Sequence, residues 1–363
     1  MKRKIAGLYD PYLDILGGGE RLILSIMKVL CENGFALEIF WDSDMRQQIK
    51  NSLNISFASE VKFTRNIFKH RSSPIEKARI LSRYDKFFYV TDGSYFYSTA
   101  KKTYIYCMVP EQSLYRQSLI NRMKTWNNIY IAISKYTQGW IKKWGIDSKL
   151  IYPYIENDFM QYDQSFTKKP IILSVGRFFR HLHAKRHDVA IQWFSELQEK
   201  HSEFKKYKLI IAGRVLSVDR DYFNELKNLA SGNNSILFYP NCSYERLLSL
   251  YRDTSYYWHM TGIDADTQKH PEKAEHLGIT PLEAMAAGGI VCGYSAGGIP
   301  ELVTHGQNGY LFTTKDELMR TMINCEKNIK KQNIIRSSAH DFIKSNFSYE
   351  VFTKRVAEVI LTK

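Results

Sequence analysis

Residues 274–312 read AEHLGITPLEAMAAGGIVCGYSAGGIPELVTHGQNGYLF, and this stretch decides how the C-terminal half of the 363-residue chain folds. The tetrapeptide 280–283, Thr-Pro-Leu-Glu, has the form of a capping box with proline in the first helical position, which predicts a helix that starts at Pro281. The glycine pair 288–289 ends this helix, and an apolar strand over 289–293 follows. The pattern therefore predicts a turn, a short helix and a buried strand in immediate succession.

The start of this helix is a candidate anion site. The first backbone N–H groups of a helix lack partners inside the helix and attract phosphate, and here they lie near Gly278, Ile279 and Thr280. Two carboxylates, Glu275 and Glu283, stand eight positions apart beside this site and are suited to bind sugar or ribose hydroxyls. Glu283 has an alternative role, because a capping box alone would use it at the start of its own helix.

Several short sequences in this stretch occur together in one known family. They are the two glutamates at this spacing, the intervening His-Leu-Gly-Ile-Thr, the run Glu-Ala-Met-Ala-Ala-Gly and the later Gly-Gly-Ile-Pro-Glu. With them the stretch resembles the donor-site motif of the retaining glycosyltransferases of family four, which have the GT-B fold. The resemblance implies an α/β protein with two doubly wound Rossmann-like domains that face each other across a cleft, and a C-terminal helix that crosses back to the first domain.

The length of the chain and its alternating strand and helix patterns also predict two domains. A chain of 363 residues with 44% apolar residues can build two cores of ordinary size. Strands and helices alternate again after residue 171, which argues for a second doubly wound sheet. We expect an N-terminal Rossmann-like acceptor domain over 1–155, a polar linker over 156–170, a C-terminal donor domain over 171–345, and a helix over 346–363 that returns to the first domain.

The N-terminal domain opens with a glycine-rich turn between two strands. A strand over 5–9, a helix over 20–32 and a strand over 35–41 form a β–α–β unit, with three glycines, 17–19, before the helix. The spacing G-x-G-x-x-G of dinucleotide-binding proteins is absent, so the glycines alone indicate a tight turn. The family resemblance implies that Gly18 and Gly19 approach the donor's diphosphate.

Two cations follow the first strand of the C-terminal domain. The buried strand over 171–175 leads into Gly-Arg-Phe, with Arg177 at the carboxyl end of the strand, where open α/β sheets bind ligands. Lys185 comes eight residues later, just before a helix expected from about residue 188. Across from the helix start at Pro281, the two cations would clamp a diphosphate, as the family resemblance also implies. The alternative is a generic basic loop.

The sequence gives little support for a metal site. His181, His183 and His187 share one loop, but no cysteine or carboxylate set accompanies them in that span. The D-x-D form at 264–266 belongs to metal-dependent glycosyltransferases of a different fold, so we interpret it as coincidence. We expect neither a metal nor another cofactor.

The resemblance implies a reaction. A sugar would move from a nucleotide-diphosphate donor to a hydroxyl of a glycan or a polyprenyl-diphosphate-linked glycan, with retention at the anomeric carbon. Arg177 and Lys185 would stabilise the leaving diphosphate together with the helix start, Glu275 would hold hydroxyls of the transferred sugar, and Glu283 would bind the ribose. An epimerase of the same fold acting on the nucleotide sugar, or a degenerate sugar-nucleotide-binding protein, remains an alternative.

The first domain departs from the family pattern at one point. Relatives often place a histidine or an aspartate near the reacting sugar, whereas the strand over 104–111, Tyr-Ile-Tyr-Cys-Met-Val-Pro-Glu, has Tyr106 at the expected position. Tyr106 or Glu111 would then assist at the acceptor site.

The net charge of +14 predicts an anionic partner. Residues 101–144 concentrate bases and aromatic rings against a single acid, Glu111. The bases are Lys101, Lys102, Arg116, Arg122, Lys124, Lys135, Lys142 and Lys143, and the rings are Tyr115, Trp126, Tyr130, Tyr136, Trp140 and Trp144. This composition suits a helix on an anionic membrane, and a solvated helix face over core aromatics is the alternative. Nucleic acid is not expected, because no DNA- or RNA-binding motif is present.

The sequence predicts a cytoplasmic protein at the inner face of the membrane. No run of 18 apolar residues is present, and the apolar run after the basic start at 1–4 is too short for a signal peptide. Five widely spaced cysteines without a C-x-x-C pair favour reduced thiols.

Overall fold

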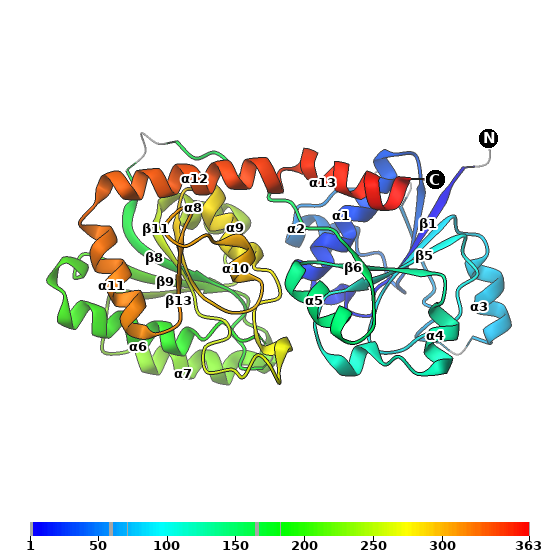
Figure 1. Ribbon diagram of the computed structural model, residues 1–363, viewed down its shortest axis with the longest axis horizontal. Coiled ribbons are helices and arrows are strands. Elements are labelled where there is room, and N and C mark those ends of the chain that lie inside the picture. Colours follow the sequence, from blue (N-terminus) through cyan, green and yellow to red (C-terminus); the bar gives the residue numbers. More distant parts are fainter. Residues whose placement is uncertain (1–2, 58–60, 71, 164–166, 182, 363) are drawn as a thin grey trace. The chain divides into compact units, whose positions relative to one another are not determined.

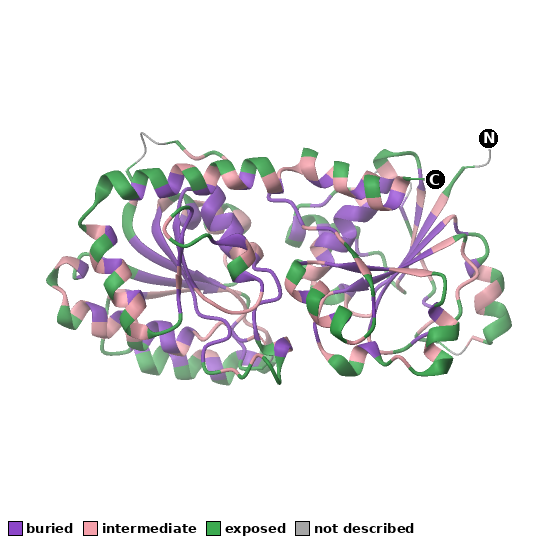
Figure 2. Cartoon of the chain, viewed as in Figure 1, coloured by how far each residue is buried: buried purple, intermediate pink, exposed green. Residues whose placement is uncertain are grey.

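A computed structural model describes residues 3–57, 61–70, 72–163, 167–181 and 183–362. The chain forms two compact units, of which the first comprises residues 1–153 and 352–363 and the second residues 154–351. Buried residues concentrate on the strands of each unit (Figure 2). No helix in the described part of the chain combines the length and the hydrophobicity that a membrane-spanning segment requires.

The first unit is built on a seven-stranded parallel sheet in the order β3-β2-β1-β4-β5-β6-β7. The strands are β1 (Ile5–Tyr9), β2 (Ala36–Phe40), β3 (Val61–Thr64), β4 (Lys86–Val90), β5 (Lys102–Cys107), β6 (Asn128–Ala132) and β7 (Ser148–Leu150). The connecting helices are α1 (Gly18–Glu32), α2 (Arg46–Leu53), α3 (Pro74–Leu81), α4 (Leu119–Thr125) and α5 (Lys135–Lys143) (Figure 1). The strand order changes direction between β1 and β4, and ligands bind at the carboxyl ends of strands at such a point.

Helix α1 begins two residues earlier than the sequence pattern predicts. The predicted start was residue 20, but Gly18 and Gly19 already belong to the helix. Gly17 is the N-cap residue, and its N–H donates to the Glu20 carboxylate at 2.6 Å. A side chain at Gly19 would collide with the Met108 sulfur, which a Cβ would approach to 2.0 Å. Glycine at 19 therefore allows close helix packing.

The second unit has a six-stranded parallel sheet in the order β10-β9-β8-β11-β12-β13. The strands are β8 (Lys169–Val175), β9 (Lys208–Gly213), β10 (Ile236–Pro240), β11 (Thr254–His259), β12 (Ile290–Tyr294) and β13 (Tyr310–Phe312). The helices are α6 (His187–Lys200), α7 (Arg220–Ala230), α8 (Tyr244–Asp253), α9 (Ile279–Ala286), α10 (Ile299–Leu302), α11 (Lys315–Glu326) and α12 (Ile329–Phe347). The order changes direction between β8 and β11.

The end of the chain returns to the first unit. Helix α13 (Tyr349–Val356) continues into a π-helical segment, Ala357–Leu361, and residues 352–363 pack with the N-terminal sheet. The buried Lys86 ammonium donates to the Ile360 carbonyl at 2.5 Å. The C-terminal helix that the resemblance implied is thereby confirmed.

Candidate functional site

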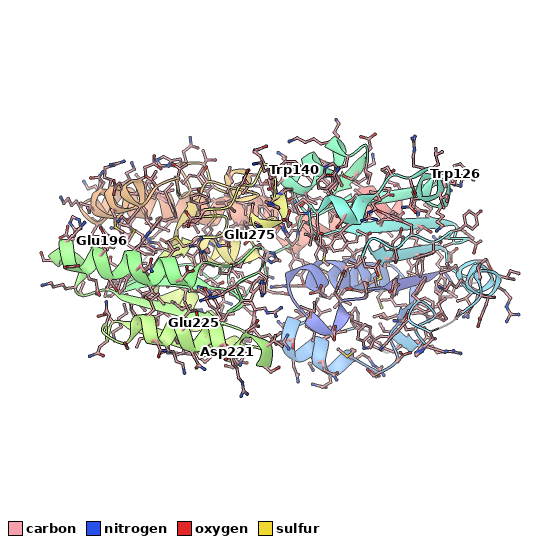
Figure 3. All side chains as sticks on the ribbon, turned by 90° about the horizontal axis from the view of Figure 1, so that it is seen from below. Trp126, Trp140, Glu196, Asp221, Glu225 and Glu275 are labelled. Atoms are coloured by element: carbon pink, nitrogen blue, oxygen red, sulfur yellow. The ribbon has the colours of Figure 1, made fainter. Side chains whose placement is uncertain are left out.

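The candidate site lies in the second unit, where β8 and β11 end side by side. The loop after β8 carries Arg177 and Lys185, β11 ends at His259, and Glu275 lies just before α9. These strands flank the point where the strand order changes direction, so their carboxyl ends form the expected ligand position. Three side chains meet there, from Lys185, His259 and Glu275 (Glu275 is labelled in Figure 3).

Lys185 and Glu275 form a largely buried ion pair. Their side chains are 12% and 9% exposed, and the Lys185 ammonium contacts Glu275 Oε2 directly. Burial by itself would raise the pKa of Glu275, but the Lys185 ammonium and the contact with His259 hold that pKa well below its usual range. Glu275 is therefore an anion near neutral pH. Gly176 makes room for the pair, because a Cβ there would lie 2.4 Å from Lys185 Cγ.

His259 is the second partner of Glu275, and the sequence pattern did not single it out. Its Nε2 atom lies 2.9 Å from Glu275 Oε2, and its side chain is 2% exposed. Burial lowers the pKa of His259, although the neighbouring carboxylate opposes this. The contact is close but lacks hydrogen-bond geometry, because His259 Nε2 has no hydrogen-bond partner among the described residues. The available signal was a histidine that directly follows three buried aromatic residues, 256–258, at the end of β11.

Arg177 has a different carboxylate partner. Its Nε atom donates to Asp219 Oδ2 at 2.9 Å, and its guanidinium stacks over the Phe179 ring at 5.1 Å. Asp219 is buried, and it was not among the residues that the sequence indicated. The structure therefore places Lys185 next to Glu275 and holds Arg177 at the neighbouring 3-10 turn Ser217–Asp219.

The helix start at this site differs from the predicted one. Helix α9 begins at Ile279 rather than at Pro281, with Gly278 as its N-cap residue in the left-handed conformation at φ 104°. Thr280 does not cap the helix, because its hydroxyl accepts a hydrogen bond from the Tyr257 hydroxyl at 2.8 Å. The capping-box interpretation of residues 280–283 is wrong. Glu283 is buried in the first turns of α9.

The glycines 297 and 298 support the segment that carries Glu275. The Gly298 N–H donates to the Glu275 carbonyl at 2.7 Å. A Cβ at Gly297 would lie 2.1 Å from that carbonyl oxygen, and one at Gly298 would lie 2.7 Å from the His276 carbonyl. The glycine turn thus lets the backbone before α10 touch the backbone before α9, which fixes the position of Glu275.

The three histidines of the β8–α6 loop do not gather into one cluster. His181 is exposed, His183 packs against His276 with ring centroids 4.7 Å apart, and buried His187 lies 3.3 Å from the Gly176 carbonyl. Burial lowers the pKa of His183 well below its usual value. Within the described residues, no three histidine, cysteine, aspartate or glutamate side chains are grouped to hold a metal ion.

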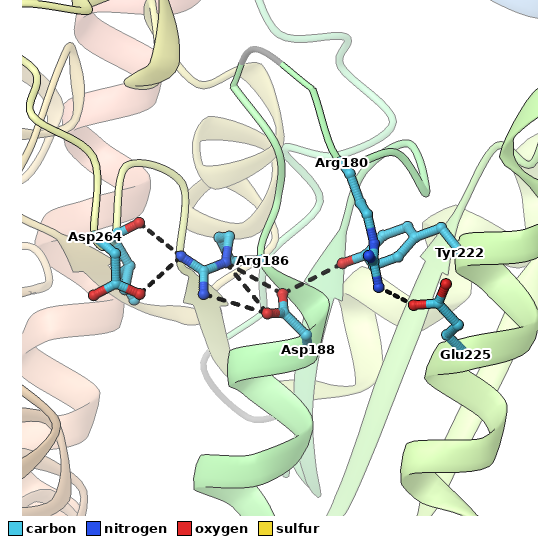
Figure 4. A network of polar contacts seen from close by, with 7 residues as sticks. Arg180, Arg186, Asp188, Tyr222, Glu225 and Asp264 are labelled. Carbon is cyan, nitrogen blue, oxygen red and sulfur yellow. Dashed lines mark hydrogen bonds and ion pairs between the residues drawn. The ribbon is translucent and has the colours of Figure 1, made fainter.

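The remaining bases of the loop are paired with carboxylates (Figure 4). Arg186 contacts Asp188 at 3.3 Å and Asp264 at 3.0 Å, and Arg180 contacts Glu225. Asp264, the first acid of the D-x-D sequence, is thus engaged by a cation.

In the first unit, Tyr106 and Glu111 do not come together. Tyr106 is fully buried, and its hydroxyl donates to the Gly19 carbonyl at 3.3 Å. Glu111 accepts a hydrogen bond from the Ser113 hydroxyl at 2.6 Å. Both lie on or after β5, but Tyr106 serves the packing of α1 in this structure.

Asp10 is the acid that the structure singles out in the first unit. It follows β1 directly, is 1% exposed, and burial together with the nearby Glu20 raises its pKa to about 8. One carboxylate oxygen accepts from the Tyr12 N–H at 2.9 Å, whereas Oδ2 has no hydrogen-bond partner among the described residues. Sequence reasoning considered β5 and overlooked the end of β1.

Comparisons with known proteins fit this geometry. The model of the family "Glycosyl transferases group 1" matches residues 156–342. The GDP-Man:Man(3)GlcNAc(2)-PP-Dol alpha-1,2-mannosyltransferase of Dictyostelium discoideum is 29% identical over 238 residues, which cover 61% of this chain and 44% of that protein. The alpha-1,3/1,6-mannosyltransferase ALG2 of Rhizomucor pusillus is 25% identical over 313 residues, or 72% of this chain and 67% of the relative. The chain thus spans only part of the length of these curated relatives.

Two solved structures share the fold over nearly the whole chain. Anabaena HepE in complex with UDP superposes with a TM-score of 0.73 at 17% identity and covers 99% of each chain. WaaG, a glycosyltransferase involved in lipopolysaccharide biosynthesis, superposes with a TM-score of 0.65 at 13% identity. The match covers 98% of this chain and 99% of the WaaG chain. The predicted fold of two Rossmann-like domains is confirmed.

Proposed function

Because the chain belongs to the glycosyl transferases group 1 family, we propose that it moves a sugar from a nucleotide-diphosphate sugar to a hydroxyl of a glycan or lipid-linked glycan. The observation that carries the proposal is the buried contact of Lys185 and His259 with Glu275 beside the start of α9. This arrangement sets a cation, an anion and unpaired helix N–H groups at one edge of the sheet, which suits a ligand with both phosphates and hydroxyls.

The leaving group explains the cations. When the bond between the anomeric carbon and the phosphate oxygen breaks, the nucleoside diphosphate gains negative charge. The Lys185 ammonium and the first N–H groups of α9 stabilise that charge, and the Arg177 guanidinium at the adjacent turn adds to this stabilisation. The bond to the acceptor oxygen forms on the same face of the sugar, and the acceptor proton passes to the departing phosphate oxygen. We propose that no metal takes part.

The carboxylates hold the hydroxyls. With the donor bound, the Lys185 ammonium turns toward the diphosphate. Glu275 then accepts hydrogen bonds from the transferred sugar, while His259 holds the Glu275 carboxylate in its orientation. Glu283, at the start of α9, binds the ribose. Each role uses an ionised carboxylate, and the lowered pKa of Glu275 supports this.

Asp10 is our first candidate for the assisting group in the N-terminal unit. It lies at the carboxyl end of β1 beside the change of strand order, and its free Oδ2 atom can bind a hydroxyl of donor or acceptor. Tyr106 and Glu111 remain second candidates.

The printed names of the relatives suggest the substrates. The Dictyostelium relative uses GDP-mannose on a dolichol-diphosphate-linked glycan, so GDP-mannose and a polyprenyl-diphosphate-linked glycan are the first pair to test. A lipid-linked acceptor would place the protein at the cytoplasmic face of a membrane.

The test combines binding and turnover in the presence of EDTA. We expect thermal stabilisation by one of GDP, UDP or dTDP, about 2.7 kcal/mol at a hundred times the Kd, and release of that nucleotide from its sugar when acceptor is added. Isomerisation of the donor without acceptor would instead favour the epimerase alternative. No shift with any nucleotide would contradict the proposal.

A further inference from the structure

Four large apolar side chains are exposed on and directly after α4. Leu119 is 78% exposed, Ile120 66%, Met123 72% and Trp126 76%. We call these four residues the α4 face (Trp126 is labelled in Figure 3). Scattered apolar residues on a surface are ordinary, but four within eight positions mark an interaction site. Elsewhere in the described chain, large apolar side chains that are more than 60% exposed occur singly, at Ile75 and Val218, or as the pair Ile329 and Ile334 on α12.

The side of α4 that faces its unit is polar, so its apolar side is turned outward. Thr125 is buried on the inner side, and its hydroxyl donates to the Asn121 carbonyl within the helix at 2.9 Å. The Lys124 ammonium donates to the Tyr95 carbonyl at 3.0 Å. A surface helix normally buries its apolar stripe. The reversed orientation indicates that the apolar side serves a partner.

The other aromatic rings of residues 101–144 do not belong to this face. Tyr115 and Tyr130 are buried, Trp144 stacks on Tyr115 at 5.6 Å, and Trp140 packs against Trp144 at 6.0 Å. The sequence pattern therefore overestimated the aromatic surface. The exposed aromatic surface here consists of Trp126 and Tyr97. Tyr97 is 57% exposed, and both rings line a hollow of about 300 Å³.

The surroundings of the α4 face are basic. Arg116 and Arg122 are exposed next to it, and no acid occurs between residues 112 and 146. Trp126 comes just before β6, at the amino ends of the strands, and Lys101 and Lys102 stand at the same end of the neighbouring β5. Ligands of such sheets bind at the opposite, carboxyl ends, so the α4 face is separate from the candidate sugar-nucleotide site.

We propose that the α4 face inserts into the headgroup region of an anionic membrane. Leu119, Ile120 and Met123 would enter the boundary between headgroups and acyl chains, Trp126 would lie at the level of the headgroups, and the flanking arginines would contact anionic lipid. The core of a protein–protein interface is depleted in charged residues, whereas here cations alternate with the apolar side chains. This inference does not rest on the proposed transferase function.

The experiment uses the full chain with vesicles of phosphatidylcholine, with and without phosphatidylglycerol, and no sugar nucleotide. We expect cosedimentation with the anionic vesicles only. The variant Leu119→Ser/Ile120→Ser/Met123→Ser should bind at least about tenfold more weakly, since it loses most of the inserted apolar area. The matched control Ile329→Ser/Ile334→Ser removes two equally exposed side chains from α12 and should bind like the wild type.

Fluorescence locates the contact. The emission of the wild-type protein should shift to shorter wavelength with anionic vesicles, and Trp126→Phe should lose this shift while it still sediments. Undiminished binding of the triple variant would overturn the proposal in favour of a purely electrostatic contact. If the protein does not bind vesicles but self-associates, and the triple variant does not self-associate, the proposal is overturned. The partner of the α4 face would then be a second copy of the chain. Intact GDP or UDP binding in the triple variant would show that either result is independent of the donor site.

Discussion

Two buried carboxyl groups, one in each unit, lie where strands end at the change of strand order, and they differ in charge state. Asp10 follows β1 in the first sheet, and Glu275 lies beside the ends of β8 and β11 in the second. Burial, with Glu20 nearby and no cation among the described neighbours, raises the pKa of Asp10 to about 8. With Lys185 against it, the pKa of Glu275 falls well below its usual range. The neighbours rather than the fold therefore decide which group is an anion.

The largest expected effect comes from removing the cation that distinguishes the two sites. Lys185→Ala should lower turnover by about 10²–10³-fold, because one contact to the developing charge is lost. It should also lower the free energy of unfolding by roughly 3–5 kcal/mol, since the buried Glu275 carboxylate is left without its cationic partner. Initial rates and urea denaturation measure the two effects.

The double variant Lys185→Met/Glu275→Gln is the control for this prediction. It removes both charges and should recover much of the stability without recovering turnover. Wild-type turnover in Lys185→Ala would remove Lys185 from the site.

Asp10→Asn tests the other half of the comparison. The pKa of Asp10 lies above its unfolded value, so the folded protein holds a proton that the unfolded chain releases, and stability falls as the pH rises from about 4 to 8. The asparagine variant lacks this loss and should be more stable than the wild type by about 4–5 kcal/mol at pH 8, with little difference at pH 4. Thermal unfolding of both proteins at pH 4 and at pH 8 measures this difference in stability.

Turnover of the same variant separates structure from function. If Asp10 assists the reaction, Asp10→Asn should be more stable and less active. A variant with higher stability and full activity would assign Asp10 to packing alone.

His187 extends the comparison to a buried base whose partners among the described residues are the Ser174 hydroxyl and the Gly176 carbonyl. Burial lowers its pKa to about 4, so it favours the folded state above pH 6.5, and this contribution is lost as the pH falls toward 4. Between pH 8 and pH 5 the loss is about 2 kcal/mol. His187→Asn should therefore show a smaller decrease in melting temperature over that range than the wild type. An unchanged slope would mean that other groups cause the acid sensitivity.

Tyr106→Phe should have the smallest effect. The hydroxyl makes one hydrogen bond, to Gly19, whose loss costs about 1 kcal/mol, and turnover should change less than tenfold. A hundredfold loss of turnover at unchanged stability would instead support the acceptor role that the sequence suggested for Tyr106.

The sequence was a good guide wherever a short local pattern determines the structure. The glycine pairs, the strand over 289–293 and the cations after β8 were found because their signals lie within a few residues. The start of α9 was misplaced because Thr280, an apparent cap, is bound by Tyr257 from a distant strand. Such a contact has no local signature.

The partners of the predicted site residues were also beyond local reasoning. Lys185 and Glu275 are 90 positions apart, and Arg177 and Asp219 are 42 apart. His259 was missed because it ends a strand whose other residues are buried as ordinary core. Helix α2 was missed because only Ile49 and Leu53 of its eight residues are buried, so its apolar periodicity is weak.

The return of the chain end to the first unit has a consequence for dissecting the protein. The polypeptide passes between the units twice, before Tyr154 and after Val351, so the second unit is an insertion within the first. Cutting one crossing leaves the halves covalently joined through the other. A fragment that stops at Val351 would deprive the buried Lys86 ammonium of its Ile360 carbonyl. Shortening the tail would therefore weaken the first unit rather than the second unit, which the tail adjoins in sequence.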